Sequence, residues 1–575
     1  MPRWGTYISI DQLGYRRASV RDVVQLASTI NRDAGLIILG MYNLALALAS
    51  MKDGQEQQTE RLNVQSALLR NSISEKRLRE MKAKFPHSHL VTNPIFHRGQ
   101  MLTMIKLVAK FGRGTGGNRL ERRDDFDVIA ELGLLVNSLT PHDLTGSERG
   151  DALAPSLAAA LEIENPPSVA ESMVRANAML GPYLDRARIH DGFARQLERL
   201  FVFSSGLNFE ELIDLTFAVW AYYNSLTVTD IIETQSLANF NPMNSKNVVS
   251  GKYMVKALDR YAIGFGEVPG LPFGSADASG LLTNHSALKS WPIWKFGDDN
   301  YFCVDPAFMQ ERLSSGVYWT IIKTLDAEDG VNFARLWGRL FERYLWAVLE
   351  SIYPPERVWR SPKYDDGDEA FDAIIDFGDR LVVIQAKSTF APADAKYASD
   401  SETFFGGMAS RFGDEPGAAI RQIRQNLVGC FGLEGRRPMA RLRGRRFREI
   451  LPLVVYQEPI LEFGLVTRHF SRELEAALQG VLFTLDLHVR PVTFMHIDDW
   501  HLIAQYIRDG DTSLVDILHA KLDVDRGHIE SFSAFWRERF RPRLNVGGKG
   551  DQVLSASWRQ YSDAALDRIR AGVYA

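Results

Sequence analysis

The chain has 575 residues, of which 45% are hydrophobic and 24% are charged, and its formal net charge is -4. This composition is typical of a globular protein with two to four domains. Only two cysteines are present, Cys303 and Cys430, which excludes a disulfide framework and a cysteine-based metal site and fits a reducing cytoplasm.

We expect no signal peptide at the N-terminal end of the sequence. Its first residues, MPRWGTYISIDQLGYRR, lack the charged-then-apolar profile of a signal peptide. Residues 35–51 carry no charge, but they include Tyr42, Asn43 and Ser50 and are at the short limit for a membrane span. We interpret this stretch as a buried helix and expect no membrane association.

Residues 1–285 show mostly helical periodicity and little chemical signal. Ser19 is a candidate cap for the first helix. We expect this region to recognise a target, a partner or a second copy of the chain. The expected helices span residues 19–30, 35–51, 55–83, 99–111, 123–138, 167–180, 186–203 and 208–225.

Two short motifs in this region are interpreted as structural. The glycine-rich residues 111–117 follow no strand and lack Gly-Lys-Ser/Thr, so they are a linker and not a phosphate-binding loop. His87 and His89 have no third metal ligand nearby in the sequence. After them, residues 291–296 and 301–304 flank a turn and predict a β-hairpin that bridges the two halves.

The C-terminal half alternates helical and β-like segments. Residues 332–352 repeat apolar side chains at three- and four-residue spacing, which predicts an amphipathic helix that Pro354 and Pro355 end. A loop is expected between Lys387 and Pro416, and Pro416 opens the next helix. The other expected elements are a strand at 357–363, an acidic turn at 364–368, a helix at 416–431, strands at 451–456 and 491–496, and helices at 468–480 and 498–508.

Residues 371–387 are the most informative stretch, and they predict a β-hairpin. Gly378-Asp379 is a glycine-first two-residue turn, so residues whose numbers sum to 757 should face each other. Asp372 then lies opposite Gln385, with Cβ atoms about 5 Å apart. Lys387 shares the face of Gln385, because side chains alternate along a strand.

These three residue types together indicate phosphodiester hydrolysis. That reaction needs a hard cation held by oxygen ligands, an oriented water and positive charge beside the phosphorus. Asp372 supplies an anionic ligand, the Gln385 carbonyl a neutral one, and Lys387 the positive charge. In the alternative interpretation, Asp372 is a solvated acid and Gln385 and Lys387 end an edge strand. The unbroken apolar run at 381–384 favours the functional interpretation, because it indicates a strand covered on both faces. Polar side chains at the end of such a strand cost free energy to bury unless they have a function.

The hairpin resembles the PD-(D/E)xK nuclease superfamily, and specifically its Q-x-K branch, typified by Mrr-like restriction endonucleases. Gly338 to Glu342 is similar to the G-x-x-F-E element on the first helix of many members. The resemblance covers residues 331–500 and implies that Asp372 binds metal, that Lys387 is catalytic and that Glu342 is an additional acid near the metal. Gln385 stands where many relatives have glutamate, so the metal site should be weaker. The resemblance also implies an α/β core with a mixed sheet flanked by helices, in a protein that is α+β overall.

Residues 436–448, RRPMARLRGRRFR, contain seven arginines and no acid. Such a density beside a nuclease core suggests contacts with nucleic-acid phosphates, and the alternative is a solvated connecting segment. Gln422 and Gln425 should lie on the outer side of the 416–431 helix, where they either contact a nucleic-acid backbone or face water. The expected phosphate-binding residues are Arg436, Arg437, Arg441, Arg443, Arg445 and Arg446.

The sequence therefore predicts a helical region at 1–285, a connector at 286–330, a nuclease domain at 331–510 and a helical extension at 511–575. The predicted activity is hydrolysis of DNA with Mg²⁺ or Mn²⁺, with RNA left open as a substrate. The resembled enzymes imply a role in bacterial antiviral defence. Besides DNA, further copies of the chain and a companion defence subunit are the partners to test. The competing hypothesis is a non-catalytic nucleic-acid-binding or assembly protein with a nuclease fold, but the retention of Asp372 and Lys387 favours the enzyme.

Overall fold

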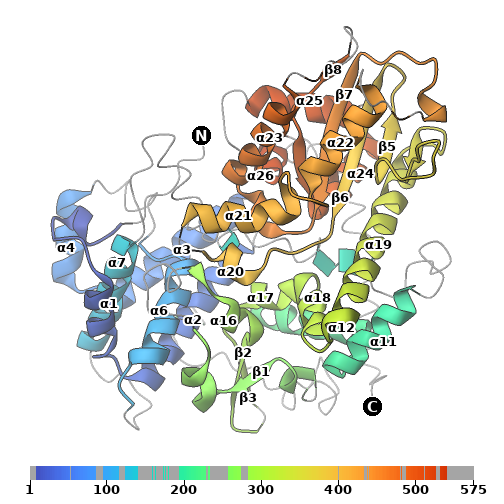
Figure 1. Ribbon diagram of the computed structural model, residues 1–575. Helices are drawn as coiled ribbons and strands as arrows, with labels where there is room; N and C mark the ends of the chain where they lie inside the picture. Colours follow the sequence, from blue (N-terminus) through green and yellow to red (C-terminus); the bar gives the residue numbers. More distant parts are fainter. Residues whose placement is uncertain are drawn as a thin grey trace.

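The chain is an α+β protein in which helices surround a six-stranded and a three-stranded sheet (Figure 1). This confirms the expected fold class. The computed structural model describes residues 8–51, 54–85, 95–114, 123–139, eight single positions between 158 and 179 (158, 162, 163, 172, 173, 175, 176 and 179), 193–227, 231–232, 255, 257–273, 283–298, 300–398, 400–432, 437, 439–479, 481, 487–510, 512–525 and 531–539.

The N-terminal region is helical, as expected. Ser19 caps its first helix through a capping box with Asp22. The expected helix at 55–83 is two helices, because Ser74 accepts a hydrogen bond from the backbone of Arg77 and begins a new one. Most of the expected helix at 167–180, and both His87 and His89, lie outside the described residues. The helices are α1 (Val20–Ala27), α2 (Arg32–Ser50), α3 (Gly54–Ser72), α4 (Glu75–Lys84), α6 (Arg98–Phe111), α7 (Arg123–Leu139), α11 (Phe193–Ser205) and α12 (Phe209–Asn224).

The uncharged stretch forms most of α2, which is a core helix of this region. In the described part of the chain, α2 is the one helix long and apolar enough to cross a membrane, but 83% of its most apolar window is buried inside the protein. It packs against α3 and α6. Its Asn43 side chain donates hydrogen bonds to Val304 O (2.8 Å) and to Asp305 Oδ2 (3.0 Å). The expectation of a buried helix is therefore confirmed.

The predicted bridging hairpin is confirmed and belongs to a small sheet. Strands β2 (Ile293–Phe296) and β3 (Asn300–Cys303) pair antiparallel, and Gly297 in the turn has a φ of 64°. A third strand, β1 (Ala262–Gly264), pairs parallel with β2 and was not expected, because three residues are too few to show alternation. Three short helices flank strands β2 and β3 in the chain: α16 (Ser286–Ser290) precedes them, and α17 (Pro306–Glu311) and α18 (Ser315–Ile322) follow them.

The larger sheet has the strand order β4-β5-β6-β7-β8, and β9 also pairs with β7. The β4-β5 and β5-β6 pairs are antiparallel and the pairs with β7 are parallel, so the sheet is mixed, as expected. The elements are α19 (Ala327–Ile352), β4 (Val358–Arg360), β5 (Ala373–Asp376), β6 (Arg380–Lys387), α20 (Ala393–Lys396), α21 (Ser401–Phe412), α22 (Ala419–Phe431), β7 (Glu449–Tyr456), α23 (Gly464–Leu478), β8 (His488–Val489), β9 (Thr493–His496), α24 (Ile497–Asp509), α25 (Leu514–Asp525) and α26 (Phe532–Arg539).

Two expectations for this half are wrong. The expected loop after Lys387 contains α20 and α21, and α21 is capped by Asp400, which accepts a hydrogen bond from Thr403 N at 2.7 Å. The following helix begins at Ala419 and not at Pro416, because Gly417 has a φ of 82°, which is outside the right-handed helical region.

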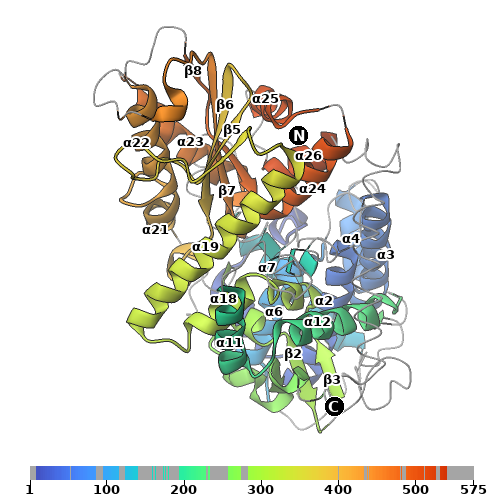
Figure 2. The same ribbon diagram turned by 90° about the vertical axis from the view of Figure 1, so that its right-hand side faces the viewer.

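Helices cover both faces of this sheet. Figure 2 shows α21, α22 and α23 on one side of it and α24, α25 and α26 on the other. Ile374, Leu381 and Val383 pack on the first side. Ile375, Val382 and Ile384 point to the opposite side, where they join a core that continues into the N-terminal helices. The helical region and the sheet thus share one hydrophobic core.

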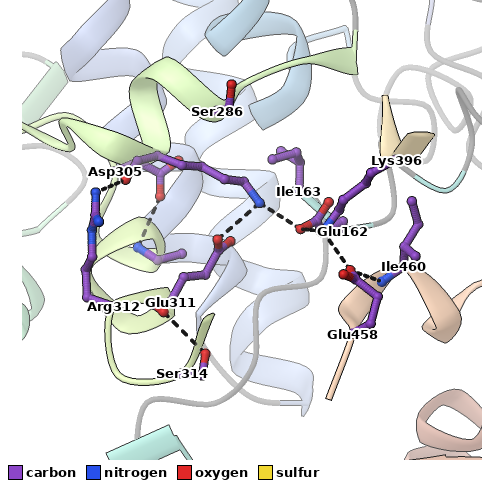
Figure 3. Close-up of polar contacts among 12 residues, drawn as sticks. Glu162, Ile163, Ser286, Asp305, Glu311, Arg312, Ser314, Lys396, Glu458 and Ile460 are labelled. Atoms are coloured by element: carbon purple, nitrogen blue, oxygen red, sulfur yellow. Dashed lines mark hydrogen bonds and ion pairs between the residues drawn. The ribbon is translucent and has the colours of Figure 1, made fainter. Parts of the chain in front are cut away.

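A buried ion-pair network also joins the two halves (Figure 3). Lys396 Nζ lies 2.7 Å from Glu162 Oε1 and 2.7 Å from Glu458 Oε1, and these two glutamate side chains are 4% and 1% exposed. Lys289 Nζ contacts the same Glu162 oxygen at 2.7 Å and Glu311 Oε2 at 3.1 Å. Lys396 on α20 therefore links Glu162 of the helical region to Glu458 in the segment that follows β7.

Candidate active site

The β5-β6 hairpin has the predicted register. Ala373 pairs with Ile384 and Asp376 pairs with Leu381, and both pairs of numbers sum to 757. Gly378 has a φ of 91°, as a glycine-first turn requires. Just beyond the paired residues, the side chain of Gln385 donates a hydrogen bond to Asp372 Oδ2. The expectation that Asp372 faces Gln385 is confirmed.

Asp372 is held firmly at this end of the hairpin. Its side chain is almost buried, with 9% of the residue exposed. Oδ2 also accepts a hydrogen bond from Ala386 N at 2.6 Å, and the backbone oxygen accepts one from Trp346 Nε1 at 2.8 Å. Burial raises the pKa of Asp372 to about 6, although the Ala386 hydrogen bond and the Lys387 charge oppose the shift.

Glu342 approaches the same point from α19. Gly338, Glu342 and Trp346 lie on successive turns of one helix face. A Cβ atom on Gly338 would lie 3.7 Å from Ser388 Oγ, and Trp346 contacts Asp372, so this face runs past the end of β6. The pKa of Glu342 is raised to about 8, mainly by burial and in addition by the negative charges of Asp372 and Glu369. The structure therefore brings Glu342 and Asp372 together.

Lys387 is anchored by uncharged oxygens. Its ammonium group donates to Gly417 O at 2.9 Å and to the side-chain oxygen of Gln422 on α22. Burial lowers the pKa of Lys387, and the charges of Asp372 and Glu342 oppose this shift. The backbone oxygen of Lys387 accepts a hydrogen bond from Gln457 N at 3.2 Å. Both the backbone and the side chain of Lys387 are thus fixed from outside the hairpin.

Three residues near this cluster were missed or misplaced by sequence reasoning. Gln422 was expected to contact a nucleic acid or water, but it binds Lys387, because the first turn of α22 packs on β6. Glu369 is exposed and its charge raises the pKa of Asp372. Arg411 is exposed on α21, in a segment expected to be a loop, and its charge lowers the pKa of Lys387.

The donor set fits a hard divalent cation. Two carboxylates, Glu342 and Asp372, have raised pKa values because burial and neighbouring negative charge disfavour their ionised forms, and a cation would relieve both effects. Among the described residues, no group of three or more His, Cys, Asp or Glu side chains could hold a metal. Further ligands would have to be the Gln385 oxygen, backbone oxygens and water, which are ligands that Mg²⁺ accepts.

The last arginines of the 436–448 stretch, Arg445 to Arg448, lie at the other end of the sheet. Arg380 pairs with Glu449 where β7 begins, and Lys387 pairs with Tyr456 where β7 ends. The seven intervening steps along β6 correspond to roughly 23 Å at about 3.3 Å per residue. Arg445 and Arg448, which pair with Asp376 and Asp379, are thus near the hairpin turn and remote from Asp372.

The expected phosphate-binding arginines have protein partners in most cases. Arg437, Arg443 and Arg445 form ion pairs with aspartates. Arg441 lies over the Trp359 ring at 5.3 Å. Arg446 is exposed and makes no ion pair with any described residue, and Arg436 lies outside the described residues.

Comparison of the chain with protein-family models, with curated proteins and with solved structures found no match. The resemblance to PD-(D/E)xK nucleases therefore stays a prediction that rests on residues 338–342 and 371–387.

Proposed function

We propose that this protein is a nuclease of the PD-(D/E)xK type, which hydrolyses phosphodiester bonds in DNA with Mg²⁺ or Mn²⁺. One observation supports this proposal above the others. Glu342, Asp372 and Lys387 interact electrostatically at one end of a hairpin, and Gln385 lies directly against Asp372. Acids, an amide and a lysine held this close inside a protein are typical of a site that handles a cation and a charged substrate.

Each residue has a distinct role in the proposed site. Asp372, Glu342 and the Gln385 oxygen would hold the cation, which when bound activates water and neutralises phosphate charge. Lys387 orients the attacking water and stabilises the negative charge that develops on the phosphate. Gln422 and Gly417 keep the Lys387 ammonium group in place. The charge of the exposed Arg411, which acts on Lys387, would attract the substrate phosphate.

The proposed setting is the cytoplasm, where the activity would act against foreign DNA. This setting is supported by Cys303 and Cys430, which are both buried and form no disulfide, as expected of thiols in a reducing compartment. The defence role draws only on analogy with the resembled restriction enzymes.

A second candidate function is a nucleic-acid-binding protein without catalysis. The orientation of Gln385 favours it, because the amide nitrogen, and not the oxygen, faces Asp372. A cation could be held by Gln385 only if its side-chain oxygen were turned toward the site. If that turn is too costly, the metal affinity is lost while the fold remains.

Incubation of the purified protein with supercoiled plasmid, linear duplex, single-stranded DNA and RNA tests the proposal. We expect cleavage of DNA with Mg²⁺ or Mn²⁺ and none with EDTA. Retention of DNA in a binding assay without cleavage in either metal would favour the second candidate.

A further inference from the structure

Two acidic turns contact the arginine segment, which we define as residues 437–448. The first turn comprises residues 364–368 and is called the acidic turn below. The second comprises residues 376–379 and is called the hairpin turn. Both are about 70 positions earlier in the chain than the arginines they meet, so the contacts are tertiary and could not be expected from local sequence.

The acidic turn binds two arginines. Arg437 Nη2 lies 2.6 Å from Asp366 Oδ2 and 2.7 Å from Asp368 Oδ2. Arg443 donates to Asp365 Oδ2. The Arg437 guanidinium also lies 4.0 Å above the Tyr364 ring, which keeps it at the surface of the turn.

The hairpin turn binds two more. Arg445 forms a two-pronged ion pair with Asp376, with nitrogen–oxygen distances of 2.5 and 2.8 Å. Arg448 Nη1 lies 3.6 Å from Asp379 Oδ2. Arg445 also lies 4.8 Å from the centre of the Phe447 ring.

These pairs almost neutralise the arginine segment. It contains six arginines, and the two turns place five aspartates within or beside it. A surface that binds nucleic acid in a salt-dependent way needs cations that exchange small counterions for phosphates. The aspartates form ion pairs with the same guanidinium groups that such phosphates would contact.

The pairs of the acidic turn are open to exchange, whereas the Arg445 and Asp376 side chains of the hairpin-turn pair are only 33% and 15% exposed. The Asp368 side chain is 75% exposed and that of Arg443 is 67% exposed. Exposed ion pairs contribute about 0–1 kcal/mol each, so replacing a carboxylate by a phosphate oxygen costs little. The nearby Tyr364 and Phe447 rings would hold Arg437 and Arg445 in position during that exchange.

We propose that the aspartates of these two turns act as internal substitutes for phosphate, and that they must be displaced before the arginine segment binds nucleic acid. The inference rests on the proposed function only for the identity of the partner. The acidic turns would limit non-specific binding, and a nucleic acid that presents several phosphates together would displace them.

The test is a binding measurement in EDTA, so that it does not depend on cleavage. We compare wild type with the triple variant Asp365→Asn, Asp366→Asn and Asp368→Asn, and use a fluorescently labelled DNA duplex as the probe. Asparagine keeps the side-chain oxygen that accepts from Asp368 N. We expect the triple variant to bind about threefold to tenfold more tightly at low salt, because Arg437 and Arg443 are released.

The control changes the net charge equally without releasing an arginine. Glu356, Asp394 and Glu402 are exposed in the same half of the chain, and none forms an ion pair with a described arginine. Their replacement by Gln, Asn and Gln should raise the affinity less than the turn variant does. Adding Arg437→Gln and Arg443→Gln to the turn variant should remove its gain, since the effect passes through these two side chains.

The result that overturns the inference is a turn variant that binds no more tightly than the control variant, or a gain that survives removal of both arginines. Failure of every protein to bind the duplex would also overturn it. A tighter-binding turn variant from a protein that never cleaves DNA would support the inference and reject the nuclease proposal, so the two failures are distinguishable.

Discussion

The side-chain amide of Gln385 donates a hydrogen bond to Oδ2 of Asp372, so the neutral member of this pair presents its nitrogen to the carboxylate. A cation at Asp372 would instead require an oxygen at that position. For Gln385 to share a cation with Asp372, its side-chain amide would have to turn.

Gln385→Glu should tighten Mn²⁺ binding by about an order of magnitude, because it adds a negatively charged oxygen ligand. Without metal, the variant should be less stable than wild type, since two carboxylates then face each other. Isothermal titration calorimetry measures the affinity. Gln425→Glu is the matched control, because Gln425 is exposed on α22 and the substitution adds the same charge away from Asp372. Equal affinities for wild type and Gln385→Glu would exclude residue 385 as a ligand.

Glu342 should make the metal-free protein less stable as the pH rises. Its pKa is about 8 in the folded protein against an ordinary value of 4.5, mainly because of burial. Between these values the folded state holds a proton that the unfolded state has lost, so the free energy of unfolding falls with increasing pH. Below the ordinary value both states are protonated and this cost is absent.

Glu342→Gln should flatten this pH dependence. Urea unfolding in EDTA at about pH 5 and about pH 9 measures the free energy of unfolding at each pH. The decrease in this free energy between the two pH values should be smaller in the variant than in wild type. Asp372 contributes a loss of the same sign in both proteins. An identical loss in variant and wild type would show that Glu342 ionises freely and is not near the acids.

Asp376→Asn should leave the cleavage of saturating DNA near the wild-type rate. Asp376 lies four residues from Asp372, roughly 13 Å at about 3.3 Å per residue, which is too far to share one cation. Its carboxylate pairs with Arg445. We expect only a small loss of stability, at most about 1 kcal/mol, in thermal unfolding. A loss of activity as deep as that of Asp372→Asn would mean that the metal ligand is misassigned.

The hairpin was predictable because its information is local. The Gly378-Asp379 turn fixes the register, and the register places Asp372 against Gln385. The contact between Lys387 and Gln422 was not predictable from the sequence, because it depends on where α22 begins and on how its first turn packs against β6.

The arginine segment was recognisable from its composition, but the residues that pair with its arginines could not be predicted from the sequence. Arg437 meets Asp366 across 71 positions, and only the folded sheet brings the two segments together. The α21 helix was missed although Phe404, Met408 and Phe412 repeat at four-residue spacing, because serine, aspartate and glycine around them suggested a loop.

Lys396→Met should destabilise the whole protein strongly. The substitution leaves Glu162 and Glu458 buried without their shared cation. Removing one partner of a buried ion pair costs about 3–5 kcal/mol. Lys295→Met is the control, because its partner Asp259 is 41% exposed and the expected loss is at most about 1 kcal/mol. Similar losses in the two variants, measured by urea unfolding, would contradict the idea that the network ties the two halves together.

The most direct test of the nuclease proposal is plasmid cleavage in Mg²⁺ by wild type, Asp372→Asn and Lys387→Ala at equal protein concentration. Circular dichroism and thermal unfolding first establish that all three are folded. The account predicts cleavage by wild type and, for each variant, no more cleavage than wild type gives in EDTA, because one loses the anionic ligand and the other the charge beside the phosphate. Cleavage by either folded variant at the wild-type rate would contradict it.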